Sequence, residues 1–187
     1  MKVLASRVMH PLHDIRLPDS LDEAIPVVIE IPKGSKLKYE IDKRTGMLML
    51  DRALYSAVHY PANYGFFPQT HAGDGDPLDV LVLMEEPVHP LTIVRARPIG
   101  GFSMRDDKGV DDKIVCIAVD DPAVAHYREA LELPPHTLRE LRRFFQDYKV
   151  LEEKFSEVDE LYDRARALQV IEESIAGYRT KAAWDKG

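Results

Sequence analysis

Three aspartates lie close together in the run Asp74-Gly75-Asp76-Pro77-Leu78-Asp79. Gly75 relieves the backbone of a turn, and Pro77 fixes φ just before a strand begins. Carboxylates this close repel one another unless a cation lies among them. Their oxygens are ligands for Mg²⁺ or Mn²⁺ rather than for soft metals. The run therefore indicates a site for hard divalent cations, although a solvated Asp-Gly turn would show the same spacing.

More acidic residues accompany this run. A second acidic stretch, in a polar loop expected at 106–112, comprises Asp106, Asp107, Asp111 and Asp112. Glu30 and Glu40 interrupt runs that otherwise read as apolar strands. The alternative is that Asp107 and Asp112 are solvated loop charges and that Glu30 faces solvent on an alternating strand. Taken together, the carboxylates strengthen the prediction of a metal site.

Basic residues sit beside members of the same set. The neighbours are Lys38-Tyr39-Glu40, Asp51-Arg52, Asp112-Lys113 and Tyr148-Lys149. Each lysine or arginine, taken alone, is more often an ordinary surface charge. A metal–phosphate complex needs both kinds of group, because carboxylates hold the metals while cations neutralise the phosphate charge that remains. The combined set predicts phosphate chemistry at a metal centre.

The elements that must position these residues begin with strands. We predict strands at residues 26–31, 37–41, 47–52, 78–83, 92–97, 101–104 and 113–119. The first three follow one another closely and predict a meander. Residues 53–77 have no period yet carry Tyr60 and Tyr64, which predicts a long aromatic loop with a function.

After Asp121 the pattern becomes helical. Apolar residues at spacings of three and four follow Pro134-Pro135 and predict a helix that runs through Leu151. Ser156 and Asp159 resemble a capping box for a last helix. Its apolar face would comprise Val158, Leu161, Tyr162, Ala165, Leu168, Ile171 and Ile175. Many short strands followed by helices predict an α+β fold, and a closed or partly closed barrel would remove the sheet edges.

The composition fits one globular domain, 1–187, since 45% of its residues are apolar. We divide it into an irregular arm (1–22), a β-barrel (23–121) and a helical part (122–187). The net charge of −7 argues against a nucleic-acid partner. No run reaches the ~20 apolar residues of a membrane span. The single Cys116 excludes an internal disulfide, and early charges interrupt any signal peptide, so we expect a cytoplasmic protein.

The chain resembles the soluble family I inorganic pyrophosphatases of prokaryotic type, whose signature is similar to the run from Asp74 to Val80. Other segments resemble the family in the same order, between about residues 25 and 150. They are Val28-Ile29-Glu30-Ile31-Pro32, Lys38-Tyr39-Glu40, Asp51-Arg52, Tyr60-Pro61-Ala62-Asn63-Tyr64-Gly65, Arg97-Pro98-Ile99-Gly100, 106–113 and Phe144-Phe145-Gln146-Asp147-Tyr148-Lys149. So many ordered matches make the resemblance specific.

The resemblance implies Mg²⁺-dependent hydrolysis of inorganic pyrophosphate to two phosphates. It implies a five-stranded OB-like β-barrel with flanking C-terminal helices, a homohexamer, and roughly three to four Mg²⁺ ions per site, with Mn²⁺ as an alternative.

The resemblance also assigns roles to individual residues. Asp74, Asp79 and Asp111 would hold the metals that activate water. Asp106 would join Asp111 on a third metal, Glu30 would face a fourth, and Asp76 would be the general base. The substrate would be surrounded by Lys38, Glu40, Arg52, Tyr60, Tyr64, Lys113, Tyr148 and Lys149.

One segment departs from the family. Members of the prokaryotic type continue after the Tyr-Lys pair into a Gly-Lys-Trp stretch, whereas an ungapped match here puts Phe155 where that lysine would fall. One interpretation is that the helix runs on to about Phe155 and that Lys154 is a solvated helix-end cation. The other is that Lys154 supplies the missing charge, which requires the helix to have ended by then.

Two other functions fit the same residues. One is a metal phosphohydrolase that acts on an organic diphosphate. The other is a non-catalytic OB-like binding module, which the acidic charge and the clustered carboxylates disfavour.

Overall fold

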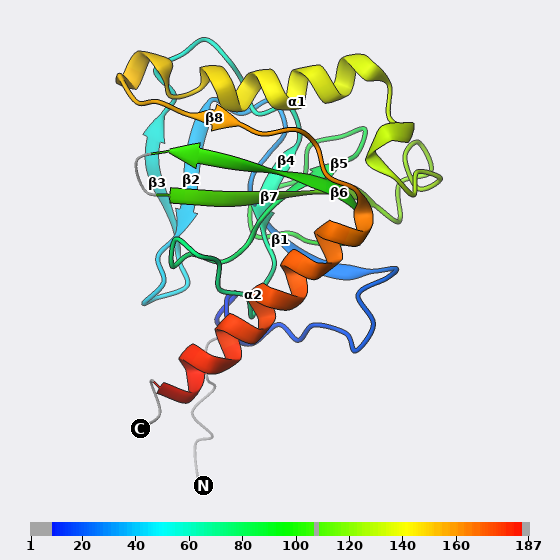
Figure 1. The fold of residues 1–187 in the computed structure, drawn as a ribbon. Coiled ribbons are helices and arrows are strands. Elements are labelled where there is room, and N and C mark those ends of the chain that lie inside the picture. Colours follow the sequence, from blue (N-terminus) through cyan, green and yellow to red (C-terminus); the bar gives the residue numbers. More distant parts are fainter. Residues whose placement is uncertain (1–8, 107–108, 185–187) are drawn as a thin grey trace, which may run out of the picture.

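A ring of five strands organises the protein. The computed structural model describes residues 9–106 and 109–184, with only the backbone described for Asp106 and for 182–184. The sheet comprises β1 (Ile25–Ile31), β4 (Asn63–Phe66), β5 (Asp79–Leu83), β7 (Gly109–Ala118), β6 (Ile93–Asp106) and β8 (Glu157–Val158), in that order. An additional pairing of β1 with β6 closes the first five into a ring, with β8 outside it (Figure 1). This closed arrangement confirms the predicted α+β, barrel-like fold.

Alternate residues of the ring strands pack on two different sides. On β7, Val115 and Ile117 belong to the hydrophobic cluster that contains residues of helix α1 (Pro135–Asp147). Ile114 and Cys116 belong to the cluster that contains residues of helix α2 (Arg164–Trp184). Since both faces are covered, the strand reads as a continuous apolar run rather than an alternating one. Cys116 is therefore a core residue, as its sequence context indicates.

The predicted three-stranded meander is wrong. β2 (Leu37–Ile41) and β3 (Leu48–Ala53) form a separate two-stranded hairpin, in which β2 does not pair with β1. The reason is that both edges of β1 are already occupied, one by β4 and the other by β6. The hairpin is consequently a separate two-stranded sheet beside the ring, and it contacts side chains of the ring such as Glu30.

The segment predicted as a long aromatic loop contains a ring strand, β4. Its four residues, Asn63 to Phe66, are all buried. All four pair with β5, and Tyr64 to Phe66 also pair with β1. Gly65 permits the pairing, since a Cβ there would lie 1.9 Å from the carbonyl oxygen of Val28. A strand this short, with both faces buried, gives no alternation for a sequence pattern to detect.

The acidic stretch at 106–112 is mostly strand rather than loop. β6 runs unbroken from Ile93 to Asp106, with an irregularity between Pro98 and Gly100, and β7 begins at Gly109. Asp111 and Asp112 therefore point to opposite faces of β7. Asp112 is no solvated charge, because its Oδ1 accepts a hydrogen bond from Ser103 Oγ at 2.7 Å. Asp107 lies outside the described residues.

Both predicted helices exist with different limits. α1 ends at Asp147 and is followed by a 3₁₀ turn, η2 (Val150–Glu152), and by Glu153 at φ 57°. A helix continuing to Leu151 or Phe155 is therefore wrong.

The last helix, α2, begins later than predicted, and the capping box at Ser156 is wrong. Ser156 Oγ donates to the carbonyl of Phe145, while Asp163 Oδ1 accepts from the backbone N–H of Arg166 at the true start. Val158 lies in β8 and Ala165 is exposed, so the buried face is Ala167, Val170, Ile171 and Ser174. Within the described residues, neither helix is long and apolar enough to cross a membrane.

Candidate active site

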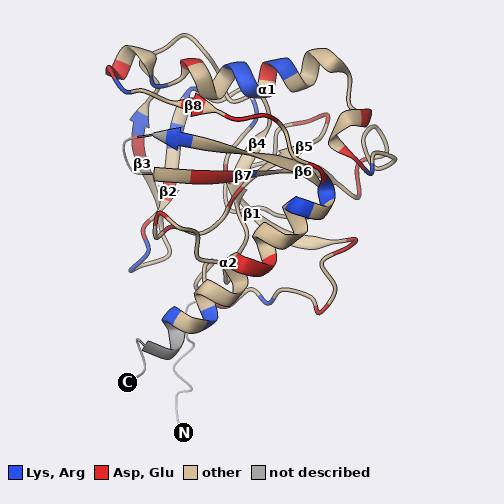
Figure 2. Ribbon diagram, viewed as in Figure 1, with Lys and Arg blue, Asp and Glu red and all other residues tan. Residues whose placement is uncertain are grey.

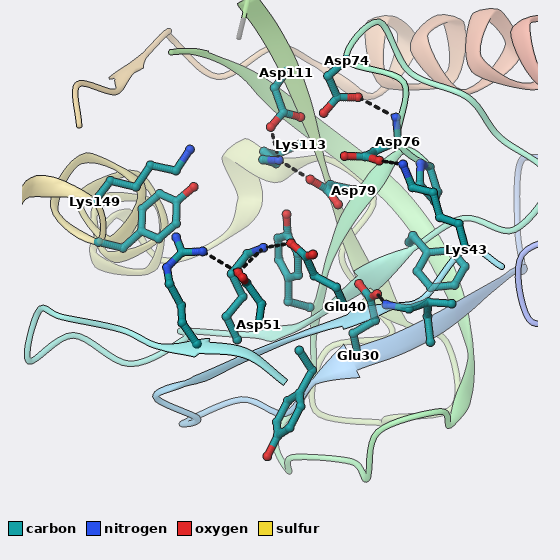
Figure 3. Close-up of a pocket in the computed structure, with 18 of the residues that line it drawn as sticks. Glu30, Glu40, Lys43, Asp51, Asp74, Asp76, Asp79, Asp111, Lys113 and Lys149 are labelled. Atoms are coloured by element: carbon teal, nitrogen blue, oxygen red, sulfur yellow. Dashed lines mark hydrogen bonds and ion pairs between the residues drawn. The ribbon is translucent and has the colours of Figure 1, made fainter. Parts of the chain in front are cut away.

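A cavity of about 450 Å³ opens where the ring, the β2–β3 hairpin and the end of α1 meet. Its lining includes twelve of the fourteen residues predicted for the site: Glu30, Lys38, Glu40, Arg52, Tyr64, Asp74, Asp76, Asp79, Asp111, Lys113, Tyr148 and Lys149. Figure 3 shows Asp74, Asp76, Asp79 and Asp111 together with Lys113 on one side of the cavity, and Lys149 and Asp51 across from them. Tyr60 is buried and does not line the cavity. The side chain of Asp106 lies outside what the structure describes.

Asp79, Asp111 and Lys113 are brought together by strand pairing. The parallel ladder of β5 and β7 sets Asp79 opposite Lys113, and Asp111 lies two residues earlier on the same face. The Lys113 ammonium forms ion pairs with both carboxylates, at 2.5 Å to Asp111. Burial would by itself lower the pKa of Lys113, but the two carboxylates outweigh burial and raise it. A buried ammonium is tolerated here because two negative charges flank it.

Asp111 and Glu30 are carboxyl groups whose ionisation the site makes difficult. Burial, with a contribution from the charge of Asp79, raises the pKa of Asp111 to about 6. Burial, again followed by Asp79, raises the pKa of Glu30 to about 8. Glu30 Oε1 accepts the backbone N–H of Ile41 at 2.7 Å, which joins β1 to the hairpin. The alternative of a solvent-facing Glu30 is therefore wrong.

The turn from Asp74 to Asp76 holds two carboxylates at the mouth of the cavity. Gly75 adopts φ 89°, and Asp74 Oδ1 accepts the backbone N–H of Asp76 at 3.0 Å. Lys43, on the turn between β2 and β3, forms an ion pair with Asp76 (Figure 3). Sequence reasoning missed Lys43, because 33 residues separate it from its partner and only the fold brings them together.

Basic side chains line the hairpin side of the cavity. The β2–β3 register places Lys38 opposite Arg52, and both side chains pair with Asp51. Lys38 also pairs with Glu40, and Arg52 Nε donates to Glu152 Oε1 at 2.8 Å. Asp51 and Glu152 were missed as positioning residues. Asp51 is adjacent to Arg52, which is a signal, whereas nothing in the sequence marks Glu152.

The remaining predicted residues are three tyrosines and Lys149, which lies against one of them. Tyr148 caps the end of α1 and stacks on Phe144 with centroids 5.3 Å apart. The Lys149 ammonium lies 5.3 Å from the Tyr148 ring. Tyr60 and Tyr64 pack together at 5.4 Å, and the Lys113 ammonium lies 5.8 Å from the Tyr64 ring. Burial raises the pKa of both tyrosines well above the usual value, so they serve as neutral supports.

Lys154 also lines the cavity, because the helix has ended before it. Its ammonium lies 3.4 Å from Glu152 Oε2, so Glu152 bridges Arg52 and Lys154. The interpretation of Lys154 as a cation on a continuing helix is thus wrong, since the chain turns it toward the site.

The donor set fits hard cations. Asp74, Asp79 and Asp111 present only oxygen atoms to one cavity, and two of them already share the positive charge of Lys113. Among residues 9–106 and 109–184, no three such side chains converge closely enough to hold a metal ion. Binding a metal would therefore require the Lys113 ammonium to give up part of its contact with these carboxylates.

Comparison with known proteins identifies the arrangement. A family model described as inorganic pyrophosphatase matches residues 27–179. A soluble inorganic pyrophosphatase of Arabidopsis thaliana is 49% identical over 90% of this chain and 80% of its own length. One from Solanum tuberosum is 50% identical over the same shares.

Solved structures agree with these relatives. An inorganic pyrophosphatase from Helicobacter pylori superposes with a TM-score of 0.84 at 40% identity, covering 88% of this chain and 98% of the other. One from Thermus thermophilus gives 0.86 at 38% identity, covering 90% and 99%. The sequence and the fold both match inorganic pyrophosphatases, and the acidic and basic residues of the cavity suit a phosphate substrate. The chain belongs to the inorganic pyrophosphatase family.

Proposed function

We propose that the protein hydrolyses inorganic pyrophosphate to two phosphate ions at the cavity described above. The observation that carries this function is one cavity lined by both kinds of charge. Asp79 and Asp111 flank Lys113 on the β5–β7 side, and Lys38, Arg52 and Lys149 come from the hairpin and the end of α1. The relatives support the same reaction, since they are named soluble inorganic pyrophosphatases.

We assign the metals to the aspartate wall. Asp74, Asp79 and Asp111 would hold Mg²⁺, Asp106 would share a further ion with Asp111, and Glu30 would face another. We expect roughly three to four Mg²⁺ ions, with Mn²⁺ as an alternative. When bound, such ions neutralise phosphate charge and lower the pKa of water.

Asp76 is the proposed general base. Its side chain is half exposed at the cavity mouth and forms an ion pair with Lys43, and its backbone N–H donates to Asp74 Oδ1. A carboxylate in this position can accept the proton of the attacking water. Its ion pair with Lys43 orients the carboxylate until the substrate complex forms.

The basic wall binds and orients the phosphates. Lys38, Arg52, Tyr148 and Lys149, together with Lys113 of β7 on the aspartate side, supply donors to phosphate oxygens. Glu40 orients Lys38. Arginine and lysine stabilise the charge that develops on the leaving phosphate. Asp51 and Glu152 hold Arg52 in place, so less side-chain freedom is lost when the substrate binds.

One assay separates this function from its rivals. Phosphate release is measured from pyrophosphate and from ATP, each with Mg²⁺ and with excess EDTA. We expect release from pyrophosphate with Mg²⁺ alone. Faster release from ATP would identify an organic-diphosphate hydrolase, no release would identify a binding module, and release in EDTA would refute the metal assignment.

We further propose a cytoplasmic homohexamer. The relatives named soluble support the absence of a membrane anchor, and the resemblance supports the assembly state.

A further inference from the structure

A second cavity, of about 300 Å³, adjoins the first. The two share Leu12, Lys43 and Pro77. The walls of the second cavity come from segments far apart in the sequence, including the N-terminal arm and the C-terminal half of α2. These two segments lie side by side, because His13 Nδ1 and the Tyr178 hydroxyl are hydrogen-bonded at 2.8 Å (Figure 1).

The lining residues of the second cavity that can carry a charge are basic, and Asp14, Asp74 and Asp76 lie near them. Lys43, Lys181, His13 and His71 line it, and none of the described lining residues is an aspartate or glutamate. Lys181 is exposed, and the described part of the chain offers it no ion-pair partner. Burial, followed by the charges of Lys181 and Lys43, lowers the pKa of His71, while Asp74 and Asp76 oppose this shift. In a chain of net charge −7, such a cavity favours an anion.

The rest of the wall is flat and apolar. The rings of His13 and Tyr178 are stacked at 5.8 Å with an interplanar angle of 27°, and buried Leu12 and half-buried Pro77 complete the surface. A bare inorganic anion would gain little from contact with these rings, of which His13 is also stacked on His10 with centroids 4.5 Å apart. The volume lies at the lower end of ligand pockets, about 300–1,000 Å³, which limits the ligand to a small molecule.

We propose that the second cavity binds a phosphate monoester that carries a flat ring, as in a nucleoside monophosphate. Lys43 and Lys181 bind the phosphate, and His13 and Tyr178 contact the ring. This binding site adjoins the proposed hydrolytic site and shares Lys43 with it, and ligand binding there does not depend on hydrolysis.

Lys43 couples the two cavities. Its ammonium is paired with Asp76 and donates to the carbonyl oxygen of Gly75 at 3.3 Å. A phosphate in the second cavity gives this ammonium another anionic partner and so competes with Asp76. A ligand that draws Lys43 away from Asp76 changes the affinity of the first cavity for its own ligands. Because coupling between two sites is reciprocal, those ligands change the affinity of the second cavity by the same factor.

Calorimetric titration of the full chain with AMP in excess EDTA tests the binding site, since metal-dependent binding in the first cavity is then suppressed. We expect AMP to bind, with adenosine and inorganic phosphate each binding at least tenfold more weakly. Lys181→Ala and Tyr178→Ala should each weaken AMP binding about tenfold. Lys36→Ala is the matched control, since Lys36 is exposed and lines neither cavity, and it should leave AMP binding unchanged.

Three results would overturn the proposal. The first is the absence of AMP binding. The second is equal affinity for AMP and inorganic phosphate, which would remove the role of the ring. The third is a loss of AMP affinity in Lys149→Ala but not in Lys181→Ala, which would place AMP in the first cavity.

A second measurement tests the coupling and rests on the proposed function. Pyrophosphate hydrolysis in Mg²⁺ is followed with increasing AMP, and each variant is compared with its own rate without AMP. We expect the rate to change at least twofold in the wild type and not in Lys43→Met. A change that persists in Lys43→Met would refute coupling through this lysine while leaving the binding result intact.

Discussion

Individual carboxylates in the cavity differ in what holds them. Asp79 and Asp111 are tied to buried Lys113, whereas Asp76 is half exposed and tied to exposed Lys43. A buried pair resists separation, because removing one partner leaves an uncompensated charge. An exposed pair contributes little and exchanges easily. The environment therefore separates Asp79 and Asp111, two of the proposed metal ligands, from the proposed base.

Substitution of these aspartates should produce two kinds of defect. Asp79→Ala and Asp111→Ala should each lower kcat by orders of magnitude and weaken Mg²⁺ binding. Asp76→Asn should keep Mg²⁺ affinity and lower kcat, because it removes a base and not a ligand. Steady-state kinetics with Mg²⁺ titration measures both. If Asp76→Asn lost its metal affinity and kept its rate, the assigned roles would be reversed.

Glu152 should act through Arg52. Its side chain is 5% exposed and accepts from Arg52 Nε at 2.8 Å, so Glu152→Ala frees the guanidinium. We expect KM for pyrophosphate to rise about tenfold, or ~1.4 kcal/mol, with a smaller change in kcat. Glu152→Gln retains an acceptor oxygen and should restore most of the affinity. Equal KM values for the two variants would show that the carboxyl group serves only the packing of this turn.

Lys149 and Lys154 should contribute unequally. Lys149→Ala should lower kcat/KM at least tenfold, or ~1.4 kcal/mol, because its ammonium lies beside Tyr148 on the cavity wall. Lys154→Ala should lower it only about threefold, since Glu152 already holds that ammonium. Comparable losses would mean that Lys154 reaches the phosphate directly.

At the scale of elements, the site depends on two strand pairings and on the end of one helix. The parallel β5–β7 ladder aligns Asp79 with Lys113, the β2–β3 hairpin aligns Lys38 with Arg52, and the end of α1 delivers Tyr148. β4 pairs with β5 on one side and on the other with β1, which holds the hairpin through the Glu30–Ile41 hydrogen bond. Disruption of β4 should therefore affect both the ring and the aspartate wall.

Gly65 is the position at which β4 can be tested. Gly65→Ala would place a Cβ 1.9 Å from the carbonyl of Val28, so the β1–β4 pairing must shift. We expect a loss of about 3 kcal/mol in the free energy of unfolding, measured by urea denaturation. Gly73→Ala is the matched control, because its Cβ would meet nothing within 4 Å, and it should change stability by less than about 0.5 kcal/mol. A Gly65→Ala protein as stable as the control would refute this account of the pairing.

At the scale of the whole molecule, a net charge of −7 coexists with a site that binds an anion. Acidic and basic residues are interspersed along the strands and helices in the view of Figure 2. The basic residues of the site act because the fold gathers them around one cavity, where low exposure strengthens their effect. Bound metal ions would add to this local positive charge.

The assembly state is a prediction at this scale. We expect sedimentation equilibrium to give a mass near six times the 21.3 kDa of one chain. The measurement is made with Mg²⁺ present and on protein whose hydrolytic activity has been confirmed. A stable, active monomer would contradict the proposed homohexamer.

The sequence by itself determined the chemistry. Carboxylates, lysines and tyrosines in ordered short segments predicted twelve residues that the fold places around one cavity, because each segment keeps its local spacing in any fold. The apolar runs likewise predicted most strands and the existence of both helices. Short-range patterns carry this information directly.

Tertiary structure alone decided how the segments meet. The meander at 26–52 was wrong because β1 is paired on both edges by strands far along the chain. β4 was missed because four residues buried on both faces show no period. Lys43 and Glu152 reach their partners over 33 and 100 residues, and no local spacing encodes such contacts. The position of Lys154 depended on where α1 ended, which packing and the left-handed Glu153 settled rather than helix propensity.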